Sequence, residues 1–404
     1  MFFFIDCLGI MVFLLIAVLF SKQRKQIDWR SVGMLIILNI FIAWFLTTFS
    51  IGREVVKAAA AGFTWLLSVA YTGIGFAFSD WVKVPQMDFF TSALLPILLV
   101  VPLFDLLTYI GFLPFIIKWI GKILAIISRQ PKFESFFAIE MMFLGNTEAL
   151  AVSKHQLQAM KGQRNLTLAM MSMSCVTASL IGVYTTMMPA EFILTAIPLN
   201  VINALLVTSI LNPVIIESKE DIVASIGSNE ENGTKGKKEP LFSFLGNSII
   251  GAGRLILIIA ANVIAFVALA ALIDKVLGSI YPQLSLEHIL GIIMYPFAWL
   301  LGLDTHEAFA FAQYMGTKIV TNEFVVMLNV GPHLSEYSRH LQGTLTIFIT
   351  SFANFSTIGM IIGCFKSLVI TEKNELISSN VSYLLLSGIL VSLLSAGIGG
   401  LFIW

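Results

Sequence analysis

Long apolar runs divide this chain, and they restrict the folds that it can adopt. Each run approaches or exceeds the ~20 residues that an α-helix needs to cross the hydrocarbon core of a bilayer. Inside that core the backbone N–H and C=O groups have no water to bond, so such runs form helices. Eight runs are present, over residues 1–20, 33–50, 92–117, 166–188, 192–212, 248–273, 341–365 and 383–404. The sequence therefore predicts an all-α polytopic membrane protein with eight transmembrane helices.

The composition agrees with a membrane protein and argues against several other classes. Of the 404 residues, 57% are hydrophobic and 12% are charged, whereas charged residues make up about 25% of a typical soluble domain. The formal net charge is zero, so we expect no nucleic-acid partner. Cys7, Cys175 and Cys364 lie far apart in apolar segments, which argues against a disulfide framework or a zinc site. We expect no metal and no other cofactor.

The positions of the basic residues predict the topology. They follow the first apolar run and do not precede it, so we interpret residues 1–20 as a helix and not as a signal peptide. With the N-terminus outside, the inside loops are 21–32, 118–165, 213–247 and 366–382, and they hold 17 of the 24 Lys and Arg residues. The outside segments hold Arg53, Lys57, Lys83, Lys275, Lys318 and Arg339. This distribution satisfies the positive-inside rule and predicts that both termini lie outside.

Three further stretches are apolar but do not match simple spans. Residues 63–78 mix apolar and small side chains, as expected of an interfacial helix. Residues 133–153 contain Glu134, Glu140 and Glu148, and residues 304–330 contain Glu307, Lys318, Asn322 and Glu323. Such interrupted stretches suit re-entrant hairpins that are buried in protein or line a water-filled cavity.

The two halves of the chain show a weak internal repeat. Each half has a polar hairpin tip, ending at Glu148 or Glu323, and then an apolar run interrupted by small and hydroxyl residues. These interruptions lie in residues 172–182 and 351–359. Paired interrupted segments indicate a transporter binding site near the middle of the bilayer.

The carboxyl groups of Glu148 and Glu323 are the strongest candidates for function. A carboxylate at membrane depth is costly and normally faces a cavity, and burial favours its protonated form. The alternative is an interfacial Glu whose side chain reaches water. Asn146, Thr147, Asn322, Asn354 and Thr357 add amides and hydroxyls at the same two places. Such a set suits a neutral ligand with several hydroxyls and a heteroaromatic ring, although any single amide could instead cap a helix.

Four stretches resemble the concentrative nucleoside transporters, most of all the bacterial branch, and the resemblance covers essentially the whole chain. They are residues 131–136, 145–148, 317–324 and 351–359. The resemblance implies eight transmembrane helices, interfacial helices, two opposed re-entrant hairpins and a homotrimer. It also implies a transport domain that moves against a scaffold in an elevator-type cycle. We divide the chain into 1–128 (scaffold and interfacial segment), 129–216 (first hairpin and following helices), 217–245 (cytoplasmic linker), 246–283 (scaffold helix) and 284–404 (second hairpin and following helices).

The same resemblance assigns residues to the two parts of a nucleoside. The nucleobase would contact Asn146, Thr147, Glu148 and Leu180. The ribose would contact Glu323, Phe352, Asn354 and Thr357, with Asn322 behind them. The family commonly has Gln where this chain has the shorter Asn146, so we expect more room and a preference for purines. Thr357 replaces the usual Ser and keeps the hydroxyl.

A second departure concerns the coupling ion. Sodium-coupled members place an Asn and a hydroxyl residue at the positions that are Met141 and Cys175 here. Sodium prefers oxygen ligands, and both oxygens are missing. We therefore expect proton coupling, with Glu148 or Glu323 as the proton carrier; sodium coupling is the alternative.

Other functions fit the sequence less well. The five histidines are scattered and show no catalytic constellation, so we do not expect an enzyme. A channel would show repeated filter motifs, which are missing from the two differing halves. A nucleobase transporter would not need the ribose set. We expect import of nucleosides across the inner membrane of a bacterium.

Overall fold

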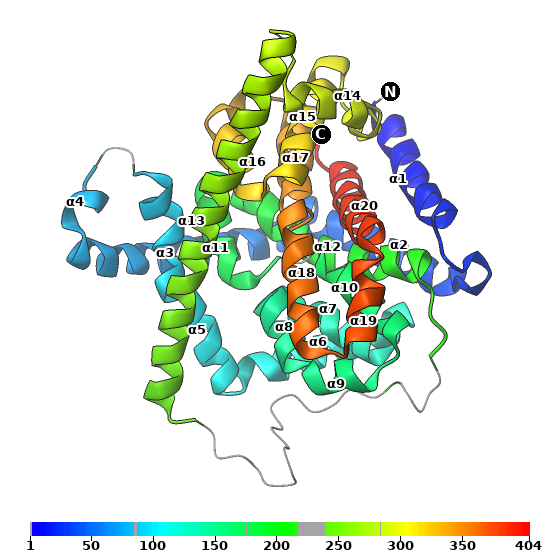
Figure 1. Ribbon diagram of the computed structural model, residues 1–404, viewed down its shortest axis with the longest axis horizontal. Coiled ribbons are helices and arrows are strands. Elements are labelled where there is room, and N and C mark those ends of the chain that lie inside the picture. The colour runs from blue at the N-terminus through cyan, green and yellow to red at the C-terminus, as the bar shows by residue number, and fades with distance from the viewer. Residues whose placement is uncertain (1, 85–86, 175, 217–220, 222–238, 283) are drawn as a thin grey trace.

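The computed structural model describes residues 2–84, 87–174, 176–216, 221, 239–282 and 284–404 (Figure 1). Within these residues the chain is helical and has no strand. The α-helices of the first half are α1 (Phe2–Leu19), α2 (Trp29–Thr47), α3 (Ser50–Ala77), α4 (Ser79–Val82), α5 (Ile97–Tyr109), α6 (Phe112–Ser128), α7 (Lys132–Leu144), α8 (Asn146–Val152), α9 (Lys154–Ala159), α10 (Gly162–Ser172), α11 (Ala178–Met187) and α12 (Ala190–Leu211). The second half has α13 (Leu241–Ile280), α14 (Leu286–Trp299), α15 (Thr305–Val320), α16 (Glu323–Val330), α17 (Arg339–Ile349), α18 (Phe355–Leu368), α19 (Thr371–Ser378) and α20 (Val381–Gly400). Shorter turns are η1 (Arg24–Gln26), η2 (Phe90–Leu94) and η3 (Gly331–Glu336).

Seven described helices are long and apolar enough to cross a membrane. They are α1, α2, α3, α5 together with η2, α12, α13 and α20. Six of these fall on predicted apolar runs, and the seventh, α3, covers the predicted interfacial stretch 63–78 up to Ala77. The other two predicted runs each form a pair of half-length helices, which agrees with the interruptions that the sequence predicts in residues 172–182 and 351–359.

The two interrupted runs break where the sequence places hydroxyl and amide residues. Residues 166–188 form α10 and α11, and residues 341–365 form α17 and α18. Thr177 caps α11 because its hydroxyl accepts a hydrogen bond from the Ser179 N–H, and Asn354 caps α18 in the same way. Side chains of this kind stabilise a helix start inside an apolar run, so the helix restarts there.

A third predicted run ends early. The run 92–117 is helical only to Tyr109, and α6 begins at Phe112 after Gly111. Gly111 has φ +88°, a left-handed conformation that glycine adopts without strain. The chain therefore changes direction at this glycine, and the apolar residues after it belong to a separate helix.

Helical hairpins occupy the two carboxylate-bearing stretches. In the first, α7 and α8 are joined at Gly145, whose φ of +94° allows the tight turn. In the second, α15 and α16 are joined by Thr321 and Asn322. The hairpins therefore place Asn146 and Glu323 each at the first turn of a short helix.

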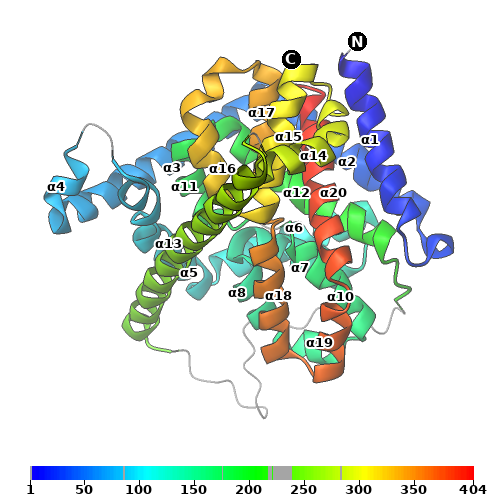
Figure 2. The same ribbon diagram turned by 45° about the horizontal axis from the view of Figure 1, so that its top comes forward.

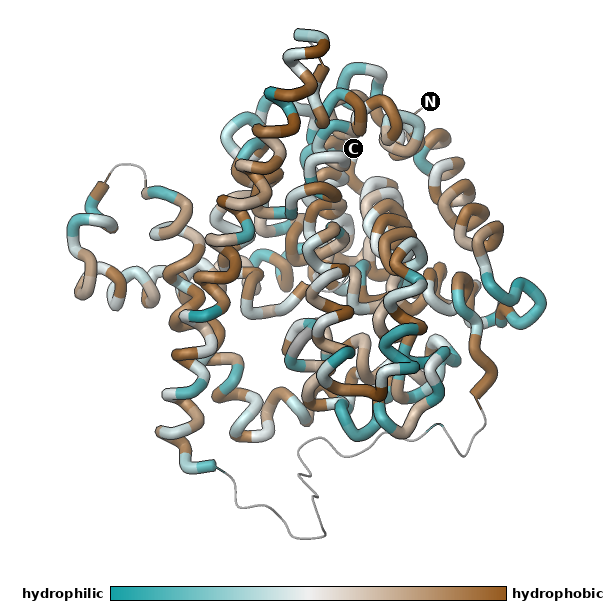
Figure 3. Tube along the Cα trace, viewed as in Figure 1, coloured by the Kyte–Doolittle hydropathy of each residue, from teal (hydrophilic) through white to brown (hydrophobic). Residues whose placement is uncertain are grey.

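The most buried helices lie at the centre of the molecule. In α12, 78% of the 18-residue window that defines the candidate span is buried, against 11% in α13. Figure 2 shows α12 and α20 in the middle, with α1, α3 and α13 around them. In Figure 1, α13 runs the full height of the molecule, α3 extends sideways, and the two chain ends lie at the same end. Figure 3 shows hydrophilic residues gathered at the opposite end, around α9 and α19.

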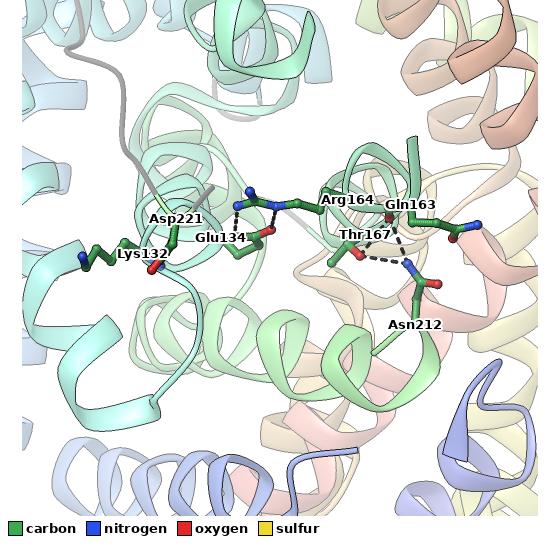
Figure 4. A network of polar contacts seen from close by, with 7 residues as sticks. All are labelled: Lys132, Glu134, Gln163, Arg164, Thr167, Asn212 and Asp221. Carbon is green, nitrogen blue, oxygen red and sulfur yellow. Dashed lines mark hydrogen bonds and ion pairs between the residues drawn. The ribbon is translucent and has the colours of Figure 1, made fainter. Parts of the chain in front are cut away.

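A buried ion pair joins α7 to α10 (Figure 4). Arg164 donates from Nε and one terminal nitrogen to the two oxygens of Glu134, each at 2.8 Å. The exposed fractions of these side chains are 2% and 5%. Nearby, the Asn212 amide donates to the Gln163 carbonyl at 3.0 Å and the Thr167 hydroxyl at 2.9 Å. These contacts fix the start of the first hairpin against α10 and the end of α12.

Most of the predicted linker 217–245 lies outside the described residues. Of its hydrophilic part, Asp221 is described, and its carboxylate accepts a hydrogen bond of 2.8 Å from the backbone N–H of Lys132.

Candidate functional site

A cavity of about 360 Å³ lies between the hairpin tips, the two helix breaks, and the helices α5 and α13. Eight of the predicted site residues line it, namely Asn146, Glu148, Leu180, Asn322, Glu323, Phe352, Asn354 and Thr357. Residues more than 200 positions apart in the sequence therefore meet at one place. Thr147 lies in the same turn, but its side chain is outside the described part of the structure.

Four helices begin at the cavity. Asn146 is the first residue of α8, and Thr177, Asn322 and Asn354 precede α11, α16 and α18. The Asn322 side chain accepts from the Val325 N–H at 3.1 Å, and the Asn354 side chain accepts from the Thr357 N–H at 2.9 Å. The predicted amides thus have a capping role, which leaves their remaining donor or acceptor atoms for other partners.

Glu323 is the centre of a hydrogen-bonded cluster. The Tyr184 hydroxyl donates to one of its carboxylate oxygens at 3.2 Å, and the Asn354 amide donates to the other at 3.2 Å. The Thr357 hydroxyl donates to the Asn354 side-chain oxygen at 3.0 Å. Glu323 is 3% exposed. The cluster therefore presents a fixed carboxylate and a hydroxyl to the cavity.

Asn146 differs from these residues because its side chain has no partner among the described residues. It is 4% exposed, and neither its amide nitrogen nor its oxygen forms a hydrogen bond. A buried unpaired amide costs about 1–3 kcal/mol. Its place on the cavity wall means that a ligand with a donor and an acceptor would remove this cost.

Glu148 lies further along the first turn of α8, and its side chain is exposed. It also lines the cavity. A Cβ atom added at Gly145 would lie 3.3 Å from a Glu148 carboxylate oxygen and 3.2 Å from the Thr177 Cβ. The tip of the first hairpin therefore needs glycine both for its backbone conformation and for space.

The residues that line the cavity on the side opposite the hairpins were not predicted from the sequence. Asp105 of α5 and Ser248 of α13 line the cavity, and the Ser248 hydroxyl donates to the Asp105 carboxylate. Asn247 and Asn262 of α13 line it too. Asp105 was a possible signal because it is a lone acid within an apolar run, but nothing in the sequence links it to Ser248.

Lys318 is a correction to the predicted topology, which counted it among charges outside the membrane. It is fully buried, and its ammonium group donates to the Phe348 carbonyl and the Ser351 hydroxyl, each at 2.6 Å. A third contact reaches the Ser392 hydroxyl at 3.3 Å. The available signal was its position five residues before Glu323 in a carboxylate-bearing stretch. Lys318 supports the second helix break and is not among the residues that line the cavity.

Met141 lies behind the first hairpin tip, away from the cavity wall. Its side chain is 3% exposed, and the thioether sulfur accepts a hydrogen bond from the Ser172 hydroxyl at 3.4 Å. Cys175 lies outside the described residues. Within the described part no group of three or more His, Cys, Asp and Glu side chains converges as metal ligands do.

Comparisons with known proteins agree with this arrangement. The family model described as the C-terminus of Na+ dependent nucleoside transporters matches residues 192–400, and the N-terminus model matches residues 8–81. The purine nucleoside transport protein NupG of Bacillus subtilis is 44% identical over 404 residues and is covered, like this chain, over 100% of its length. The nucleoside permease NupC of Helicobacter pylori is 28% identical, over 98% of this chain and 96% of that protein.

Solved structures show the same fold. A structure of CNTnw in an inward-facing substrate-bound state has a TM-score of 0.91 at 24% identity, and it covers 100% of this chain and 98% of that one. An outward-facing structure of a doubly substituted CNTnw variant also gives 0.91, with the same identity and coverage. The fold thus agrees with the sequence comparisons. Because the C-terminal model matches more than half of the chain and NupG is 44% identical over its whole length, this chain belongs to the family of concentrative nucleoside transporters.

Proposed function

We propose that this protein imports nucleosides across the inner membrane of a bacterium by proton symport, with a preference for purine nucleosides. The observation that carries the proposal is the cavity in which Asn146, at one hairpin tip, faces the Glu323 cluster at the other. One end offers an amide to a base, and the other offers a carboxylate and a hydroxyl to a sugar.

The ribose end uses Glu323, Phe352, Asn354 and Thr357. A carboxylate that already accepts from Tyr184 and Asn354 keeps lone pairs free for ribose hydroxyl donors. Phe352 lines the cavity beside them, and Asn322 holds the turn by capping α16. A free nucleobase has no hydroxyls for this cluster, which supports a nucleoside as the ligand.

The base end uses Asn146, Thr147, Glu148 and Leu180. The Asn146 amide has both a donor and an acceptor available, as the edge of a purine requires. The shorter side chain of Asn leaves about one methylene more room than Gln. The name of the Bacillus subtilis relative, a purine nucleoside transport protein, points the same way.

Proton coupling is supported by Met141 and Cys175. The family models are described as Na+ dependent, but this chain has sulfur at both positions where sodium-coupled members have side-chain oxygens. The Met141 sulfur is occupied by the Ser172 hydroxyl, and thioether sulfur is a poor ligand for a hard cation. Glu148 and Glu323 both line the cavity, and we propose that one or the other carries the proton.

Two features support an elevator-type cycle in which re-entrant hairpins and broken helices move together. Hairpin tips and half-helices form one side of the cavity, and the continuous helices α5 and α13 form the other. We assign the first group to a transport domain and the second to a scaffold, with both chain termini outside. The six continuous spans and the two broken pairs would then make eight crossings, with α3 at the interface.

A homotrimer is supported by the exposed apolar surface of α13. This helix has 40 residues, or about 60 Å at 1.5 Å per residue, which is twice the ~30 Å hydrocarbon core. Its candidate span is only 11% buried. Other copies of the chain would cover the part that lipid does not, and the mass of the purified protein in detergent tests this.

The transport experiment uses purified protein in liposomes and labelled inosine. One arm imposes an inward pH gradient without sodium, and the other imposes an inward sodium gradient at equal pH. We expect accumulation in the first arm only. Accumulation that requires sodium would favour the sodium-coupled alternative, and equal competition by free bases would favour a nucleobase transporter.

A further inference from the structure

We propose that Glu140 is a proton-binding site inside the first hairpin, separate from the cavity, and that its proton is coupled to nucleoside binding. The inference rests on the proposed proton symport and adds a third candidate proton carrier to Glu148 and Glu323. Neither the sequence motifs nor the cavity assigns any role to this residue.

The position of Glu140 is enclosed. It lies on α7 with an exposed fraction of 0%, and it does not line the cavity. One carboxylate oxygen accepts a hydrogen bond of 3.0 Å from the Ser153 hydroxyl, and the other has no partner in the described part of the chain. The carboxyl group therefore receives a single neutral donor.

No cation compensates this group among the described residues. Arg164 is the basic residue of α10, and it is bound to Glu134 through two hydrogen bonds. The titratable or charged groups on the helices packed against α7 are Lys118 and Lys122 of α6, Glu148 of α8, Arg164 of α10, Tyr184 of α11 and Glu191 of α12. Neither an ion pair nor a hydrogen bond joins any of them to Glu140.

An ionised carboxylate in this setting would lose its hydration in return for one hydroxyl contact. The effective penalty for a buried unpaired ion is several kcal/mol, whereas a protonated carboxyl group carries no charge to desolvate. The enclosed conformation therefore retains a proton on Glu140. Release of that proton requires water to reach the carboxyl group, and hence a change in the packing of the hairpin.

The hydrogen bond from Ser153 couples the protonation of Glu140 to the conformation of the hairpin tip, where the ligand would bind. Glu140 precedes the hairpin tip and Ser153 ends α8 after it, so their contact closes the hairpin around residues 145–148. The tip carries Asn146 and Glu148 on the cavity wall. A proton that stabilises the closed hairpin therefore also stabilises the geometry that binds the base, and by linkage the bound nucleoside favours the proton.

The test compares the wild type with Glu140→Gln in liposomes. Glutamine has the shape of the protonated acid and its oxygen accepts from Ser153, so the variant mimics the loaded state. Because glutamine is uncharged like the protonated acid, we expect inosine exchange across the membrane to stay within about twofold of the wild type, a difference of about 0.4 kcal/mol. Accumulation driven by an inward pH gradient should be lost. A variant that still accumulates inosine as the wild type does would overturn the proposal.

A control separates this effect from any general loss of charge. Glu54→Gln changes an exposed acid of α3 and should leave exchange and accumulation unchanged. If the wild type itself ignores the pH gradient and follows sodium, then both the proposed coupling and the role of Glu140 fail. If the wild type follows the pH gradient and Glu140→Gln does too, then the role of Glu140 alone fails.

The number of protons that the protein binds together with inosine provides a second measurement, and this measurement does not require the variant to be active in transport. Calorimetric titration with inosine, in buffers of different ionisation enthalpy, counts the protons bound with the ligand. We expect the count to fall by about one in Glu140→Gln. Ser153→Ala removes the one donor to the ionised form, so its proton uptake should persist to higher pH than in the wild type. An unchanged count in the first variant, or an unchanged pH dependence in the second, would contradict the inference.

Discussion

The ammonium group of Lys318, near the end of α15, donates a hydrogen bond of 2.6 Å to the hydroxyl of Ser351, in the break between α17 and α18. The same nitrogen lies 4.4 Å from the centre of the Phe348 ring. A buried cation thus ties the second hairpin to the second broken helix. The two elements that carry Glu323 and Asn354 are held in register by a residue that lines no part of the cavity.

Removal of this cation should destabilise the protein. In Lys318→Met, the Phe348 carbonyl and the Ser351 hydroxyl each lose a buried hydrogen bond from the ammonium group. Ser351 keeps its contact of 2.7 Å with the Ser392 hydroxyl, so we expect a net loss of about 1–3 kcal/mol. We expect the unfolding temperature in detergent to be lower than that of the wild type. Tryptophan fluorescence during heating measures this temperature. Lys366→Met, which changes an exposed lysine of α18, is the control. Equal unfolding temperatures in the two variants would refute the structural role of Lys318.

The contact from Tyr184 to Glu323 should contribute to ligand binding. Tyr184→Phe removes one donor at 3.2 Å and leaves the one from Asn354. The net worth of such a bond is about 0.5–1.5 kcal/mol, so we expect inosine affinity to fall about two- to tenfold in a binding titration. Tyr281→Phe, at a site that is 57% exposed, should have no effect. Unchanged affinity in Tyr184→Phe would mean that Asn354 alone positions the carboxylate.

The length of the side chain at position 146 should control the choice of base. Asn146→Gln restores the longer amide and reduces the room for a purine. We expect the ratio of guanosine to uridine transport to fall about tenfold, which corresponds to about 1.4 kcal/mol. Asn146→Ala adds room but removes the amide, and it should weaken both substrates together. A guanosine preference that survives in Asn146→Gln would show that another residue selects the base.

Two ion pairs of different burial make a matched comparison. Glu134→Gln removes the carboxylate charge that pairs with the buried Arg164, and breaking such a pair costs about 3–5 kcal/mol. Glu191→Gln breaks the pair with Arg339; the Arg339 and Glu191 side chains are 66% and 47% exposed, and such a pair contributes about 0–1 kcal/mol. We therefore expect a large loss of thermal stability in the first variant and little in the second. Similar losses would mean that the buried pair is not the anchor of the first hairpin.

The elements that the sequence predicts well are those with a local chemical signal. Hydroxyl and amide residues inside an apolar run indicated a helix break, and Thr177 and Asn354 cap helices at those breaks. Carboxylates in apolar stretches indicated hairpins, and their tips meet at the cavity. In these cases one or two neighbouring residues determine the local structure, so a single sequence is sufficient.

The features that were missed depend on contacts between distant segments. The hydrogen bond between Ser248 and Asp105 joins residues 143 positions apart. Lys318 looks like any basic residue at a helix end until the partners from α17, α20 and the helix break are in place. The helix in the run 92–117 ends early because of the left-handed conformation of Gly111. The apolar residues around Gly111 give no signal for this conformation.

The four helices that begin at the cavity have an electrostatic consequence. Each N-terminus carries roughly half a positive charge, and these ends face the carboxylates of Asp105, Glu148 and Glu323, with no lysine or arginine among the lining residues described. On the cavity wall described, the negative charge of the site is thus opposed by helix dipoles and neutral hydrogen-bond donors, and not by a cationic side chain. A phosphorylated ligand would bring about two more negative charges with no counter-ion to meet them. A kinase that phosphorylates the imported molecule would therefore trap it inside the cell, and the uptake would become irreversible without any change in the transporter.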